Sequence, residues 1–186
     1  MPSSTFVIPR SLAALAGLLC ALFVLAACMP TLNWRESSPE KSGFVVLMPA
    51  KPDRLNRPID LNGLKVTMNM LGSKVNEVAY TVAWVDTPSP DAAQRAAEAM
   101  RIGMLRNIGQ VDRPGVPAKV SIRVANSSGA LVTWPALRVD VKTGAQQMSA
   151  LFLHRGSRAW QVVSLAPKLD LEASKIFAES FQLLPE

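Results

Sequence analysis

The sequence predicts an α+β domain in which a mainly antiparallel β-sheet is packed by an internal helix and a C-terminal helix. The first observation is a series of short segments in which apolar and polar residues alternate, as in half-buried strands. The second is a pair of amphipathic helical segments, one inside the domain and one at its end. Most strands follow one another through turn residues, which favours antiparallel pairing.

The first half of the domain contains three expected strands, at 44–48, 64–70 and 78–85. The first is a short apolar run closed by Pro49, which is typical of a buried strand. Asn62-Gly63 is a turn signal before the second strand, and residues 72–76 are expected to turn the chain into the third. Both alternating sets of the third strand are apolar or small, so we expect it inside the sheet. Residues 51–58 are expected to form a loop.

An amphipathic helix is expected to begin after residues 87–89 and to end near Gly109. Ser89 is a suitable N-cap, and Pro90 fits the first helical position. Small and apolar residues recur on one helical stripe: Ala93, Ala96, Ala97, Met100, Met104 and Ile108. The methionines are interpreted as core side chains rather than as metal ligands, because they belong to this stripe.

The second half contains five further expected strands, at 119–124, 130–134, 137–142, 147–153 and 159–165. Residues 111–118 are rich in proline and glycine and are expected to form a loop. Pro135 is expected to mark an edge or a bulge. The last two strands are predicted to form a hairpin closed by residues 154–157. A helix capped by Asp170 and a short extended tail complete the chain.

An uncharged apolar run over residues 11–27 precedes Cys28. One cation, Arg10, stands before the run, as at the charged start of an export signal. The run is shorter than the roughly 20 apolar residues that a membrane-spanning helix usually needs. The small residues Ala26 and Ala27 suit a peptidase site before Cys28. An uncleaved anchor helix and an ordinary secretory signal are the alternatives.

Leu25-Ala26-Ala27-Cys28 resembles the lipobox of bacterial lipoproteins. This resemblance implies cleavage between Ala27 and Cys28, and attachment of diacylglycerol to the Cys28 sulfur. An acyl chain such as palmitate on the new N-terminus would complete a stable membrane anchor, because several chains hold where one does not. The implied organisation is a lipoprotein signal peptide over 1–27, a lipidated tether over 28–43 and a single α+β domain over 44–186.

The expected tether is polar and contains two prolines and several serines. Trp34 within it is expected either at the membrane interface or packed on the domain. Residue 29 is Met rather than Asp, which by the same resemblance implies the outer membrane, with the domain facing the periplasm.

Three segments of the domain occur in an order similar to that of PsbP/DcrB-like domains. They are FVVLMP at 44–49, YTVAWVD at 80–86 and FAESF at 177–181. The resemblance implies a sandwich of sheet and helices over nearly all of the mature chain. It implies no activity, because these families do not share one chemistry.

The composition restricts the kinds of chemistry to expect. Both cysteines lie at or before position 28, so the domain has none for a disulfide or a thiolate metal site. His154 is the only histidine, so we expect no zinc or copper site and no cofactor. His154 would also be the only base for a catalytic triad, and it is predicted to be a solvated turn residue. A hydrolase, with catalytic residues that come together only in the folded structure, is the least favoured function.

Charge and aromatic residues suggest where a partner would bind. The formal net charge is +6 without a dense cationic cluster, so nucleic acid is not expected. Lys51, Arg54 and Arg57 lie in one predicted loop and would form a basic rim if that loop met the turn flanked by Arg155 and Arg158. Scattered solubilising charge is the alternative.

Trp134 would offer an aromatic contact to a partner, with core packing as the alternative. The predicted function is a lipid-anchored, non-catalytic envelope protein that binds or supports an envelope partner. A periplasmic carrier or sensor of a small ligand is the alternative.

Overall fold

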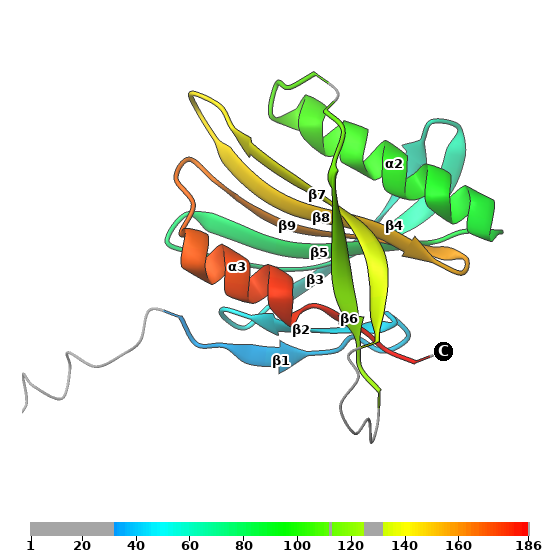
Figure 1. Cartoon of the computed structure of the whole chain (residues 1–186), viewed down its shortest axis with the longest axis horizontal. Coiled ribbons are helices and arrows are strands. Elements are labelled where there is room, and N and C mark those ends of the chain that lie inside the picture. The colour runs from blue at the N-terminus through cyan, green and yellow to red at the C-terminus, as the bar shows by residue number, and fades with distance from the viewer. Residues whose placement is uncertain (1–31, 112, 125–131, 186) are drawn as a thin grey trace, which may run out of the picture. The chain divides into compact units, whose positions relative to one another are not determined.

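The computed structural model describes residues 32–111, 113–124 and 132–185, which form ten strands and two helices (Figure 1). The strands are β1 Arg35–Ser37, β2 Phe44–Met48, β3 Asp53–Leu61, β4 Leu64–Val75, β5 Val78–Asp86, β6 Val116–Ile122, β7 Thr133–Lys142, β8 Gln147–Arg155, β9 Arg158–Ala166 and β10 Gln182–Leu183. The helices are α2 Pro90–Asn107 and α3 Leu171–Ser180. The predicted α+β class is confirmed.

The strands of the described residues form one sheet in the order β1-β2-β10-β6-β7-β8-β9-β5-β4-β3. Every pair in this order is antiparallel except β10 with β6, which is parallel. The sheet curls, so that β2 and α3 lie over one face of the central strands while α2 crosses the other face (Figure 1). The central strands are therefore buried on both sides.

β5 illustrates why the sheet has two cores. Tyr80 and Val82 of β5 point into the core shared with β2 and α3. Ala83 and Val85 of the same strand point into the core beneath α2. Alternation along the strand produces this division, because successive side chains point to opposite faces. The prediction that β5 lies inside the sheet is confirmed.

Both helices begin where the sequence predicts. The Ser89 side chain accepts a hydrogen bond from the Ala92 amide at 3.2 Å, with Pro90 at the first helical position. The Asp170 carboxylate accepts one from the Ala173 amide at 3.0 Å. The alanine-rich stripe of α2 is buried, and its small side chains suit close packing on β8 and β9.

Two turns also match the sequence signals, although their extent differs. Asn62 and Gly63 both have positive φ, at 56° and 90°, as a two-residue hairpin turn requires. The β8–β9 hairpin is confirmed, but its turn is Gly156-Ser157 alone, because Arg155 pairs with Arg158. His154 accordingly lies in β8 rather than at the hairpin tip.

Several segments were wrongly expected to be loops or turns. Residues 53–58 belong to β3, an edge strand paired only with β4, and residues 72–75 continue β4. Residues 116–118 begin β6. Pro135 lies within β7 opposite Lys119 of β6, so it does not interrupt the strand. Residues 130–131 of one expected strand lie outside the described residues.

The compact domain begins earlier than predicted, at Leu32 rather than at residue 44. β1 lies within the expected tether and pairs with β2, and the Asn33 amide donates to the Pro49 carbonyl at 2.8 Å. Trp34 is half-buried and packs against the core. Residues 32–43 are therefore part of the fold, because they complete an edge of its sheet.

The strands have two ends, which we name by their connections. The entry end carries Asn33, the β2–β3, β4–β5 and β7–β8 connections and the β9–α3 segment, and the far end carries the β3–β4 and β8–β9 turns. Register places Lys74, Ala79, Leu165, Met148 and Val141 on one row near the entry end. Asp86 and the pair Arg155–Arg158 lie on a row at the far end. On β5 these rows are seven residue steps apart, from Ala79 to Asp86, which corresponds to roughly 23 Å.

Candidate functional site

A groove at the far end lies where β7 separates from β8 beneath α2. The ladder between the two strands begins with Leu137 opposite Phe152. Before that point the Trp134 Nε1–H donates to the His154 carbonyl at 2.6 Å. Pro135 stands in this stretch and has no N–H with which to extend a ladder. The separated strands leave a pocket of about 340 Å³.

The walls of this groove, which we call the Trp134 groove, are mainly apolar. The lining residues are Gln94, Ala97, Glu98, Trp134, Pro135, Ala136, Leu137, Phe152, Leu153 and His154. Leu137 is 37% exposed, which is high for an apolar residue of a central strand. Most of the lining side chains are apolar, so the groove is suited to binding an apolar group.

The polar rim of the groove is held by neighbouring side chains. Glu98 accepts hydrogen bonds from Arg101 Nε at 2.9 Å and from Nη2 at 2.6 Å, one on each carboxylate oxygen. A bidentate pair of this kind fixes the orientation of the carboxylate. The His154 carbonyl is occupied by Trp134. Glu98 is therefore engaged within α2, and the His154 residue also borders the groove.

A second hollow of about 280 Å³ adjoins the β8–β9 turn and is bordered by Arg155 and Arg158. Arg155 lies over the Trp134 ring at 5.8 Å, and Arg158 lies over the Trp160 ring at 5.9 Å. Arg158 also forms an ion pair with Asp86. Arg155 donates to the Leu184 carbonyl at 3.1 Å. Both cations are therefore engaged within the fold.

The predicted basic rim is not assembled on one face. Arg54 pairs with Leu71 and Arg57 pairs with Met68, and these partners belong to the two different cores. The two arginines therefore point to opposite faces of β3. Lys51 lies before β3 in the connection from β2. Trp134 lies in β7, separated from β3 by four intervening strands, so it does not join this group.

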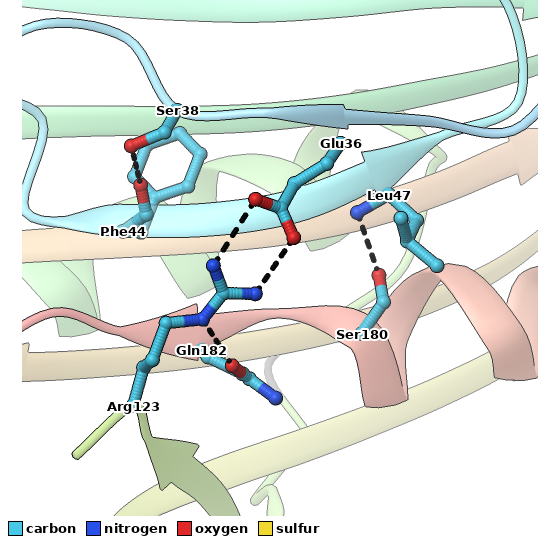
Figure 2. A network of polar contacts seen from close by, with 7 residues as sticks. All are labelled: Glu36, Ser38, Phe44, Leu47, Arg123, Ser180 and Gln182. Atoms are coloured by element: carbon cyan, nitrogen blue, oxygen red, sulfur yellow. Dashed lines mark hydrogen bonds and ion pairs between the residues drawn. The ribbon is translucent and has the colours of Figure 1, made fainter. Parts of the chain in front are cut away.

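The segment that enters the domain is fixed by a polar network (Figure 2). Arg123, just after β6, donates to both carboxylate oxygens of Glu36, at 2.7 and 3.1 Å, and to Gln182 Oε1 at 3.0 Å. The Leu47 amide donates to the Ser180 hydroxyl at 3.0 Å. The hydrogen bond from Arg123 holds the pKa of Glu36 below its usual value and raises that of Arg123.

Sequence reasoning did not find this network or the partners of Trp134. Glu36 was assigned to a tether, and Arg123 has no local signal that relates it to residues 36 or 182. Gln94 and Glu98 reach the groove from α2, about 40 positions from Trp134 in the chain, and only the packing of α2 on the sheet brings them there.

The remaining predicted site residues, Ala27 and Cys28, lie outside the described residues. In the part of the chain that is described, no three His, Cys, Asp or Glu side chains gather as potential metal ligands. No helix of that part is long and apolar enough to cross a membrane. No protein-family model matches the chain, and no curated protein matches it in sequence.

Proposed function

We propose that the chain is a lipid-anchored cell-envelope protein that binds an envelope partner through the Trp134 groove without catalysing a reaction. Leu25-Ala26-Ala27-Cys28 supports the anchor, with cleavage before Cys28 and acylation of that residue. Met29 favours the outer membrane, with the domain in the periplasm.

The observation that carries the proposal is that the chain enters at one end of the strands and the Trp134 groove opens at the other. Asn33 bonds to Pro49 at the entry end, while Trp134 and His154 lie toward the far end. On β5 the rows of Ala79 and Asp86, near the two ends, are seven residue steps apart, roughly 23 Å of extended chain. An anchor on Cys28 would leave the groove open to a partner in the periplasm.

We also propose a PsbP/DcrB-like domain, because the three segments on which that resemblance depends pack together. Phe44 of the first segment contacts Trp84 of the second, with ring centroids 5.4 Å apart. Phe44 also stacks on Phe181 of the third at 5.3 Å. Tyr80 and Phe177 form a further edge contact at 5.4 Å. The pattern thus corresponds to one aromatic core.

A photoreactive residue at Leu137, in otherwise full-length protein expressed in its own cells, tests the partner. Leu55 is the matched control, because it is also a strand leucine and is 61% exposed. We expect one protein to be captured reproducibly from Leu137 and not from Leu55, and to be lost in Cys28→Ser. Equal capture at both positions, or none from Leu137 at normal protein levels, would contradict partner binding at the groove.

The second candidate is a carrier of a small apolar ligand, favoured by the same pocket of about 340 Å³. That volume falls at the lower end of the usual range for small-molecule sites. Native mass spectrometry of the purified lipidated protein separates the two functions. A co-purifying small molecule that is lost in Trp134→Ala would favour the carrier, whereas an empty groove would favour the protein partner.

A further inference from the structure

We infer that the entry end of the domain docks on the surface of anionic lipids, an inference that rests on the proposed lipid anchor. The link between the anchor and the domain is short. Four peptide links join Cys28 to Leu32, where the compact domain begins, and they span at most about 14 Å. A domain tethered so closely must bring the surface around Leu32 to the headgroups.

The surface at the entry end carries several exposed cations. Five exposed cations lie in β1, at the ends of β4 and β7, or in the connecting segments of this end: Arg35, Lys51, Lys74, Lys142 and Lys168. Among the described residues, none of these five has a carboxylate within ion-pair distance. They are therefore available to lipid phosphates.

Register shows that these cations share one end although they are distant in sequence. Lys74 lies on the row of Leu165 and Val141, and Lys142 follows Val141 directly. Lys168 is three positions beyond Leu165 in the segment before α3. Lys51 is two positions from Pro49, whose carbonyl holds Asn33. Figure 1 shows the β4–β5, β7–β8 and β9–α3 connections at the same end of the strands.

The carboxylates of this end do not cancel the cations. Asp53, Glu77, Asp170 and Glu172 are exposed there, and Asp170 is engaged in capping α3. Glu36 of β1 is also exposed but is paired with Arg123. The five cations without an ion pair thus exceed the three carboxylates that remain, which are Asp53, Glu77 and Glu172. Anionic leaflets attract cationic groups within about a Debye length, roughly 8 to 10 Å at physiological salt.

An exposed leucine adds an apolar contact beside the lysines. Leu171 at the start of α3 is 73% exposed and borders a hollow with Lys142 and Lys175. The two carboxylates of that hollow are already paired, Asp140 with Arg138 and Glu179 with Lys175. Lys142 therefore lies beside an exposed apolar side chain, a combination that suits the interface between headgroups and acyl chains.

The test is lysine acylation of the lipidated protein reconstituted in vesicles. One set contains phosphatidylcholine alone, and the other contains about one third phosphatidylglycerol. We expect Lys51, Lys74, Lys142 and Lys168 to react several-fold more slowly on the anionic vesicles. Lys65 and Lys119, which are exposed near the far end, should react equally on both. Roughly 1 M salt should abolish the protection, because it shortens the Debye length to about 3 Å.

Equal reactivity of all six lysines on vesicle-bound protein would overturn docking and leave the anchor intact. Protein that does not float with vesicles of either composition would instead contradict the anchor. The two failures are therefore distinct.

An environment-sensitive dye provides a second measurement. Its attachment sites are Ala145→Cys at the entry end and, as the control, Ser157→Cys in the far turn. We expect a spectral shift on anionic vesicles only at position 145. Substitution of the four lysines by glutamine should remove that shift, and a shift that persists in this variant would contradict the role of the lysines.

Discussion

The entry end and the far end both carry cations, but they use them differently. At the far end Arg155 and Arg158 lie over tryptophan rings, and Arg158 is paired with Asp86. At the entry end Lys51 and Lys168 lie in connecting segments and have no ion-pair partner among the described residues. Cations that are held by rings and carboxylates stabilise the fold, whereas solvated lysines remain available to another surface.

The far end is also held by aromatic packing. Phe44, Trp84 and Phe181 form an aromatic cluster toward the far end, and the Trp160 indole donates to the Ser42 carbonyl at 3.0 Å. Rigid rings and fixed hydrogen bonds hold the far end in one arrangement. We therefore expect substitutions at the far end to cost stability and substitutions at the entry end to change membrane contact.

The largest effect is expected from Phe181→Ala, which removes a buried ring that stacks on Phe44. The free energy of unfolding should fall by about 3 to 5 kcal/mol, the usual cost of emptying a buried aromatic site. Leu171→Ala at the entry end is the control and should change it by less than about 0.5 kcal/mol. Urea denaturation measures both, and similar losses would remove the distinction between the ends.

Gly43→Ala should have the next largest effect. Gly43 has a φ of +72°, and an added Cβ would lie 2.9 Å from Arg158 Nη1 and 3.3 Å from the Trp160 ring. Strain of this kind costs of order 1 to 3 kcal/mol. Gly144→Ala is the control, because nothing lies within 4 Å of its added Cβ. An unchanged urea midpoint in Gly43→Ala would contradict the close contact between Gly43 and Arg158.

Trp134→Phe tests how the groove is held. Phenylalanine retains an aromatic wall but loses the indole N–H that donates to His154. The free energy of unfolding should fall by about 1 kcal/mol, the typical net value of one hydrogen bond. Capture from a photoreactive residue at Leu137 should weaken in parallel. Full stability together with full capture would show that the hydrogen bond does not shape the groove.

Glu36→Gln should have the smallest effect, and a specific pH dependence. A carboxyl whose folded pKa lies below its unfolded value stabilises the fold at neutral pH, and this contribution is lost as the pH falls through the folded pKa. The pKa of Glu36 is lowered from 4.5 by Arg123, so the wild-type advantage should shrink on acidification below about pH 5. The pair is exposed, so high salt should also reduce it. A stability difference that does not change with pH would contradict the assignment.

The sequence predicted the elements whose residues carry a local signal. The small-residue stripe and the Ser89 cap located α2, and the double apolar alternation placed β5 inside the sheet. β3 was missed because it is exposed on both faces and contains Pro58, so it shows no alternation. β3 is a strand because it pairs with β4. The Asn62-Gly63 turn signal lies between the two strands and is the one local sign of this hairpin.

The sequence identified single residues of the candidate site, but not the groove that they form. Trp134 stood out beside Pro135, but its groove depends on α2 and β8, which are brought to it by the fold. Lys51, Arg54 and Arg57 appeared as one cluster because they are close in sequence. A strand separates such neighbours onto opposite faces, so proximity along the chain did not become proximity in space.

Lipidation of Cys28 is the central claim, because the docking of the entry end and the presentation of the Trp134 groove both depend on an anchor at that residue. Cells expressing the wild type and Cys28→Ser would be labelled with a palmitate analogue, and the mature N-terminus would be determined by mass spectrometry. We predict labelled wild type beginning at Cys28, and an unlabelled Cys28→Ser form that retains residues 1–27. Labelling that survives in Cys28→Ser, or a wild-type N-terminus elsewhere, would contradict the account.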